Sequence, residues 1–203
     1  MKATFSRALA LALAAATLSG CAALVVGGAA VGTALVVSDR RTSGAILEDQ
    51  AIELKAMNRV RDVLGERGHV NPTSYNRTLL LTGEVPGEAE RTAAERTAAG
   101  IDNLKGVVNE LAVMGNTSLT ARSNDSILSG KVKASFIDAK DLQANAVKVV
   151  TERGTVYLMG RVTEREANRA TELARGVSGV QKVVRVFEIL SEAELAAIEP
   201  ARK

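Results

Sequence analysis

Residues 145–167, NAVKVVTERGTVYLMGRVTEREA, decide the fold of this chain. The run predicts a strand, a tight turn, a second strand and the start of a helix. Its many valines favour a packed, pleated surface, and Glu152-Arg153-Gly154 supplies the turn between the strands. Thr163, followed three residues later by Glu166, has the spacing of a helix capping box. The stretch is therefore a β-hairpin that leads directly into a helix.

A weaker copy of this stretch lies at residues 70–91, where LLLTGEV (79–85) mirrors VYLMGRV (156–162). Each copy extends to a unit of helix, strand, strand, helix and strand, which predicts an α+β fold with two helices on a three-stranded mixed sheet. The elements expected in the first unit are a helix from Asp49, strands 70–75 and 78–85, a helix 88–99 and a strand 107–113. Those expected in the second unit are a helix 125–140, strands 147–151 and 155–162, a helix 164–175 and a strand 183–190.

The composition excludes several kinds of site. One cysteine among 203 residues excludes an internal disulfide, and one histidine with one cysteine gives no plausible metal cluster, so we expect neither a metal nor another cofactor. His69 is interpreted as a surface residue, and no nucleophile motif or phosphate loop is present, so we expect no enzyme. Residues 176–179, GVSG, resemble the GxxG loop of RNA-binding KH domains. A helix-to-strand turn explains them better, and we expect no nucleic-acid partner.

The N-terminus has the pattern of a secretory signal, with Lys2 and Arg7 before an apolar run at residues 8–18. The run ends in Leu18-Ser19-Gly20-Cys21, which resembles the lipobox of bacterial lipoproteins. That resemblance implies cleavage after residue 20 and a thioether-linked diacylglycerol and an N-acyl chain on Cys21. Several acyl chains anchor firmly, because each buried CH₂ contributes about 0.8 kcal/mol. Ala22 after the cysteine fits lipoproteins that are sent on to the outer membrane.

The next apolar run, residues 22–37, is too short for a spanning helix, which needs about 20 apolar residues. Three glycines within it also weaken a helix. Two interpretations stay open: a flexible tether near the bilayer surface, which we favour, and a small-residue helix that packs on lipid or protein. We expect a lipidated N-terminus and tether at 21–44, domains at 45–115 and 124–190 joined by a linker at 116–123, and a tail at 191–203.

Together the lipobox, the tether and both repeats resemble the tandem BON-domain outer-membrane lipoproteins, most closely members associated with cell division and outer-membrane stress. The resemblance implies a periplasm-facing protein, held in the outer membrane by its lipid, that binds anionic phospholipid through its second BON domain and supports outer-membrane integrity. The strand glycines of that family correspond to Gly83 and Gly160 here. We expect both glycines to permit close packing of a neighbouring backbone rather than to bind a ligand.

The charge of the two units differs. Residues 45–115 contain eight basic and eleven acidic residues, a net charge of −3, whereas residues 124–190 contain eleven basic and eight acidic residues, a net charge of +3. The second unit is therefore the better candidate for an anionic surface. On its first helix, Leu128, Val132 and Phe136 should face the sheet. The opposite face carries an apolar patch with a basic border, made of Ile127, Gly130, Lys131, Lys133, Ala134 and Ile137.

This face suits a bilayer interface, where apolar side chains enter the acyl boundary and lysines attract anionic lipid. In the first copy the equivalent face is expected to be mixed and solvated, with Leu54 and Lys55 beside Arg61 and Asp62. Two alternatives stay open. The isoleucines could pack on the other domain, and the whole protein could be an adaptor for outer-membrane assembly proteins that meets the membrane only through its anchor. The second hairpin is also apolar on both faces, so Tyr157 and Met159 should meet the first domain or a partner.

Overall fold

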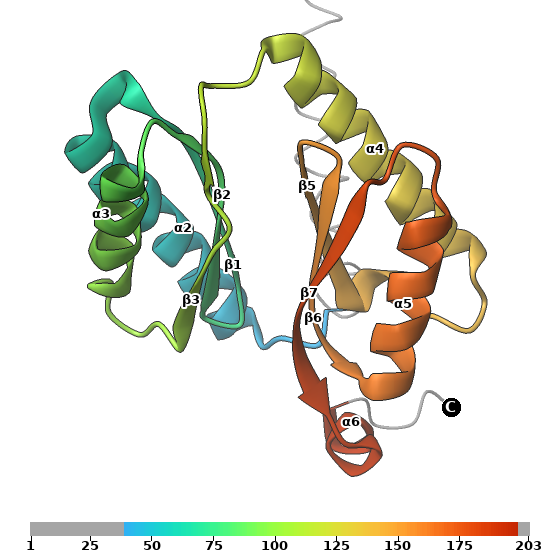
Figure 1. Cartoon of the computed structure of the whole chain (residues 1–203). Helices are drawn as coiled ribbons and strands as arrows, with labels where there is room; N and C mark the ends of the chain where they lie inside the picture. Colours follow the sequence, from blue (N-terminus) through green and yellow to red (C-terminus); the bar gives the residue numbers. More distant parts are fainter. Residues whose placement is uncertain (1–38, 199–203) are drawn as a thin grey trace, which may run out of the picture. The chain divides into compact units, whose positions relative to one another are not determined.

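The computed structural model describes residues 39–198, and the elements below belong to the compact unit Arg40–Lys203. Each repeat forms a mixed sheet with helices on one face (Figure 1). The first repeat contains α2 (Ser43–Leu64), a 3-10 turn (Gly65–Arg67), β1 (His69–Tyr75), β2 (Thr78–Val85), α3 (Glu88–Ala99), β3 (Gly106–Asn109) and β4 (Ala112–Val113). The second contains α4 (Leu119–Asp138), a 3-10 turn (Ala144–Ala146), β5 (Val147–Glu152), β6 (Thr155–Thr163), α5 (Glu164–Gly176), β7 (Lys182–Leu190) and α6 (Glu192–Ile198). The predicted α+β class is confirmed.

The two sheets share one topology. The second strand of each hairpin is central: β2 pairs antiparallel with β1 and parallel with β3 and β4, and β6 pairs antiparallel with β5 and parallel with β7. Both hairpins turn through two residues with positive φ, Asn76 (49°) and Arg77 (68°) in the first and Arg153 (50°) and Gly154 (69°) in the second. Such turns match the natural twist of paired strands. The predicted hairpins are therefore confirmed.

The third strand of the first sheet differs from the prediction of one strand over 107–113. It is interrupted after Asn109, and the sheet therefore has four strands rather than three. The Asn109 side chain causes the break, since its Oδ1 accepts from the backbone N–H of Leu111 and its Nδ2 donates to the carbonyl oxygen of Arg91. Leu111 thereby turns into the core, where it is buried.

The first helix of each repeat begins earlier than predicted. α2 begins at Ser43 rather than Asp49, and α4 begins at Leu119 rather than Asp125, so the last five of the eight residues expected in the linker are helical. Thr42 and Ser118 cap these helices by accepting hydrogen bonds from the backbone N–H groups of residues three positions later. The apolar periodicity is weak in these first turns, and for that reason the sequence alone placed both starts too late.

Both strand glycines are required by the neighbouring backbone. A Cβ atom on Gly83 would overlap the carbonyl oxygen of His69 on β1, and Gly83 also has a φ of +114°. A Cβ atom on Gly160 would overlap the carbonyl oxygen of Ala146, just before β5. The close approach explains glycine at both positions without a ligand.

Three apolar clusters hold the described unit together. In each repeat the helices pack on one face of their own sheet, with Phe136 and Leu158 in the second core and Ile52 and Leu81 in the first. The third cluster lies on the other faces of the sheets, where Tyr75 and Leu80 of the first repeat meet Tyr157 and Met159 of the second. The expectation that Tyr157 and Met159 meet the first domain is therefore confirmed.

Candidate functional site

The helix α4 packs on the second sheet in the predicted orientation. Leu128, Val132 and Phe136 are buried against the sheet. The six residues predicted on the opposite face are all exposed: Ile127, Gly130, Lys131, Lys133, Ala134 and Ile137. Their exposure excludes the alternative that the isoleucines pack on the other domain.

Two large apolar side chains dominate this surface. Ile127 is 59% exposed and Ile137 is 72% exposed. Leu119 is 79% exposed and lies on the same side of the helix, since it is five turns before Ile137. We call Leu119 and the six predicted residues the α4 outer face. It spans roughly 27 Å along the helix axis at 1.5 Å per residue.

Leu119 was missed because the helix was expected to begin only at Asp125. A helix start at Ser118, a good capping residue, was the available signal. With it, the helix begins almost two turns earlier than predicted, and the outer face gains Leu119. The extended face increases the apolar area that α4 offers to a surface.

The outward side of α2 is mixed, as expected. It exposes the apolar side chains of Leu47 (66%) and Leu54 (56%) together with charged ones. Exposed apolar residues alone therefore do not distinguish the two helices. The charge pattern does: Lys55, Arg61 and Asp62 are exposed on α2, where both signs are mixed, whereas exposed Lys131 and Lys133 flank the isoleucines on α4.

A groove of about 550 Å³ adjoins the α4 outer face. Ile127 and Lys131 contribute to its lining from α4, and Gly154 and Gly179 contribute from the turns that face them. Lys131 forms no hydrogen bond or ion pair with any residue in the described range 39–198. Its ammonium group is therefore available to an anionic group that enters the groove.

The position of α4 on its sheet is fixed by a carboxylate that caps the hairpin. The two oxygens of Asp125 accept hydrogen bonds from the backbone N–H groups of Arg153 and Gly154, each at 2.8 Å. Ser129, one turn later, donates to the hydroxyl of Thr151 at 2.8 Å. The hairpin of β5 and β6 thus holds α4, the helix that presents the exposed face.

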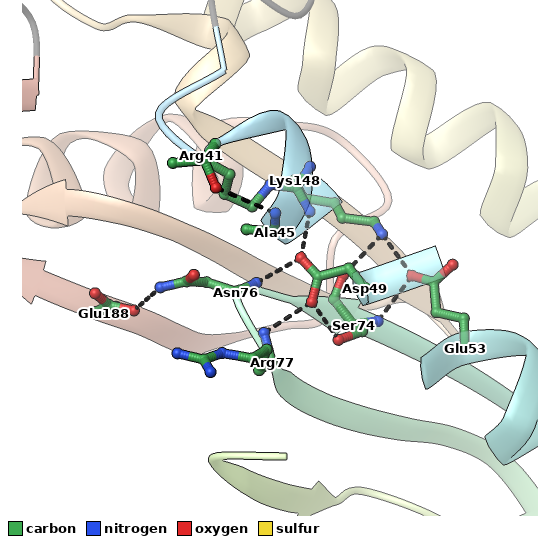
Figure 2. Close-up of polar contacts among 10 residues, drawn as sticks. Arg41, Ala45, Asp49, Glu53, Ser74, Asn76, Arg77, Lys148 and Glu188 are labelled. Atoms are coloured by element: carbon green, nitrogen blue, oxygen red, sulfur yellow. Dashed lines mark hydrogen bonds and ion pairs between the residues drawn. The ribbon is translucent and has the colours of Figure 1, made fainter. Parts of the chain in front are cut away.

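The first repeat uses the same device, as Figure 2 shows. Asp49 on α2 accepts from the backbone N–H groups of Asn76 and Arg77, each at 2.7 Å, and from the hydroxyl of Ser74 at 2.6 Å. Burial would raise the pKa of Asp49, but these hydrogen bonds and the one from Arg41 outweigh it and hold the pKa below its usual value. Sequence reasoning missed both aspartates, although each stands at the same place in its repeat.

We expect Asp125→Ala to lower the free energy of unfolding by about 2 kcal/mol, because two turn N–H groups lose charged acceptors. Hydrogen exchange should accelerate at the amides of Arg153 and Gly154. Asp138→Ala, at the exposed end of the same helix, is the control and should change stability by at most about 0.5 kcal/mol. Equal stability losses in the two variants would contradict the capping role.

Several expectations concern residues outside the described range. The signal peptide, Cys21 and most of the expected tether precede residue 39. The end of that tether, 39–44, is described, and it contains the buried Arg40 and the start of α2 at Ser43. Within the described residues, no helix combines the length and the apolar character that a membrane span requires. Within the expected tail, α6 occupies Glu192–Ile198.

His69, interpreted as a surface residue, is only partly exposed. Its side chain is 30% exposed, and its Nδ1 atom is enclosed, 3.5 Å from a carboxylate oxygen of Glu84. The contact arises because β1 and β2 are antiparallel and place His69 opposite Glu84. The register of the two strands brings these side chains together. The prediction that no metal cluster exists was made from the numbers of histidines and cysteines and did not consider strand register.

Comparison with known proteins agrees with the repeat boundaries. Residues 49–115 and 124–191 each match the BON domain. The chain belongs to the BON-domain family. The outer membrane lipoprotein DolP of Haemophilus influenzae is 41% identical over 176 residues, which cover 85% of this chain and 90% of that protein. The family named from the sequence motifs is therefore confirmed.

Other relatives are more distant. The 21 kDa hemolysin of Actinobacillus pleuropneumoniae is 32% identical over 73% of this chain and 78% of that protein. A solved structure of CdsD, a structural protein of the type III secretion system of Chlamydia trachomatis, aligns with a TM-score of 0.29 and 13% identity, covering 76% of this chain and 70% of that one. A TM-score this low supports no structural argument.

Proposed function

We propose that this BON-domain protein is a non-enzymatic outer-membrane lipoprotein, anchored through Cys21 and facing the periplasm, whose second BON domain binds anionic phospholipid and supports outer-membrane integrity. The observation that carries the proposal is the α4 outer face, where three exposed apolar side chains lie beside two lysines. The relationship to an outer membrane lipoprotein supports an envelope-associated role.

The physical argument rests on partial insertion of the α4 outer face. Ile127 and Ile137 would enter the boundary between headgroups and acyl chains, while each nearby lysine contributes about 1 kcal/mol toward anionic lipid. This chain has no tryptophan, and Phe136 is buried, so neither anchors the helix deeply. Weak binding suffices, because an acyl anchor at Cys21 would hold the domain near the bilayer at a high effective concentration.

The test uses the unlipidated unit Arg40–Lys203 with phospholipid vesicles that differ only in their content of anionic lipid. We expect sedimentation with anionic vesicles, and little with zwitterionic ones. Ile127→Glu with Ile137→Glu should weaken binding at least about tenfold, because two apolar contacts are replaced by repulsion. The matched control is Leu47→Glu with Leu54→Glu on α2, which should leave binding unchanged.

A second pair of variants isolates the charge. Lys131→Ala with Lys133→Ala should weaken binding to anionic vesicles about 30-fold at low salt and less at high salt, because salt screens exposed charges. If the unit binds no anionic vesicle, or binds equally well with both isoleucines replaced, the lipid proposal fails. The adaptor for outer-membrane assembly proteins would then be the better description.

A further inference from the structure

A histidine and two buried glutamates meet between the two BON domains. His69 begins β1, Glu84 is near the end of β2, and Glu152 ends β5 of the other domain. One ligand atom from each side chain lies within 4.8 Å of the others. Sheet pairing within the first domain and the contact between the sheets bring them together, although His69 and Glu152 are 83 positions apart in the sequence.

Two of the three side chains have unused ligand atoms. Glu152 is only 4% exposed, yet its carboxylate forms no hydrogen bond or ion pair with any residue of the described part of the chain. The enclosed Nδ1 atom of His69 likewise lacks a hydrogen-bond partner there. A buried carboxylate without a partner is costly. Both groups point into the same cluster, and a cation there would satisfy them.

The third side chain, Glu84, is fully buried and held in place. Its Oε1 accepts from Arg153 Nη1 at 2.9 Å, and its Oε2 accepts from the Thr117 hydroxyl at 3.2 Å and from the Thr117 backbone N–H at 3.3 Å. A carboxylate has about four acceptor positions, so these three contacts leave one for a metal bond. The Thr117 contact also ties the linker to the cluster.

The surrounding charges leave negative charge unneutralised. Glu84, Glu152 and Asp125 face two guanidinium groups, those of Arg122 and Arg153. Burial, together with the nearby charge of Glu84, raises the pKa of Glu152 to about 7.

We propose that His69, Glu84 and Glu152 form a binding site for a divalent transition-metal ion, with zinc as the first candidate. One imidazole nitrogen and two carboxylate oxygens are ligands that Zn²⁺ accepts, with a fourth position left for water. An open cleft of about 440 Å³, lined by His69 and Glu152 among others, gives an ion access from solvent.

The site would couple metal binding to the association of the two domains. Two ligands belong to the first BON domain and one to the second, so a bound ion links them. Because the ion binds only the arrangement that brings the three ligands together, it would stabilise that arrangement. The inference does not depend on lipid binding, since none of the three residues belongs to the α4 outer face.

The test uses the full-length chain in detergent, without a histidine tag and with Cys21→Ser to remove the only thiol. Zn²⁺ is titrated calorimetrically after removal of metals with a chelator. We expect one Zn²⁺ per chain and a higher melting temperature when zinc is present. The imidazole proton signals should shift in the same titration, and their assignment is unambiguous because His69 is the only histidine.

The variants His69→Ala and Glu152→Gln should each weaken zinc binding about 100-fold or more. Glu152→Gln keeps the side-chain shape and removes a buried charge, so it should remain folded by circular dichroism. Glu53→Gln is the matched control: it breaks the 2.8 Å ion pair between Glu53 and Lys148 of the other domain without touching the cluster, and zinc binding should persist. Absence of zinc binding by the parent chain, or equal binding by His69→Ala and Glu152→Gln, would overturn the proposal.

Discussion

Gly83→Ala is expected to lower the free energy of unfolding by about 4 kcal/mol, which combines the cost of overpacking with that of an unfavourable φ. The new Cβ would overlap the carbonyl oxygen of His69, and the φ of +114° at Gly83 is one that alanine rarely adopts. Neither strain can be relieved without parting β1 from β2. Gly160→Ala should cost less, about 2–3 kcal/mol, because Gly160 has the overlap with Ala146 but not the positive φ.

Urea unfolding of the unit Arg40–Lys203 measures both losses. Gly106→Ala is the control, because nothing lies within 4 Å of the added Cβ there, and its effect should stay within about 0.5 kcal/mol. A stability near that of the parent protein for Gly83→Ala would mean that β1 and β2 are not as close as described. Loss of vesicle binding in Gly160→Ala should follow unfolding rather than precede it, because the hairpin supports α4 but does not contact lipid.

Arg40→Ala is expected to cost about 3 kcal/mol, because it leaves a buried carboxylate without its partner. Arg40 and Glu166 are each 4% exposed, and the guanidinium donates to both carboxylate oxygens at 2.8 Å. It also donates to the carbonyl oxygen of Arg161 at 2.9 Å. The start of the described unit is thereby fixed to the second BON domain before the chain enters α2.

The pH dependence of this pair has a definite sign. Burial would raise the pKa of Glu166, but hydrogen bonds from Arg40 and from the backbone of Thr163 outweigh it, so the pKa is lowered. A lowered folded-state pKa contributes stability above the unfolded-state value, near 4.5, and that stability is lost as the pH falls below it. The difference in stability between the parent protein and Arg40→Ala should therefore be large at pH 7 and shrink in acid.

A double-mutant cycle isolates the ion pair from other effects of Arg40. Glu166→Gln retains an acceptor for the backbone N–H of Thr163, as a capping box requires. Arg40→Ala should therefore cost much less in the Glu166→Gln background than in the parent. Arg67→Ala, which removes an exposed ion pair with Glu90, should cost at most about 1 kcal/mol. An equal cost of Arg40→Ala in both backgrounds would contradict the account.

The sequence predicted the local features well, because their signals are local. The turn at Arg153-Gly154, the capping box at Thr163 and the limits of β2 each depend on residues within a few positions of one another. The exposed side of α4 followed from helical periodicity alone. The first residue of α4 could not be predicted in this way, because a helix cap carries a weaker signal than an apolar repeat. Leu119 was missed for that reason.

The missed contacts join residues far apart in the chain. Arg40 bonds Glu166 across 126 positions, and Glu152 approaches His69 from the other domain. No periodicity reports such pairs, because they depend on strand register and on how the two sheets meet. The contacts of the two buried aspartates were also missed, although the duplication could have predicted them. Asp49 and Asp125 occupy matching places in the two repeats and accept hydrogen bonds from matching turns.

The apolar face of the second hairpin was first considered as a surface for the other domain or for a partner. Tyr157 and Met159 are buried against the first BON domain, so that face serves the domain contact. Burial, and then the nearby charge of Glu110, raises the pKa of Tyr157 to about 12, so its hydroxyl stays protonated there. The exposed apolar side chains of the second domain are therefore concentrated on α4.

The most direct test of the lipid proposal places an environment-sensitive fluorophore on the α4 outer face. The unit Arg40–Lys203 lacks Cys21, the only cysteine, so Ala134→Cys provides a single labelling position. Asn58→Cys, exposed on the outward side of α2, is the matched control. On addition of anionic vesicles, the label at position 134 should move to an apolar environment and shift its emission to the blue, while the label at position 58 should not. An unchanged spectrum at position 134, or equal shifts at both positions, would contradict the account.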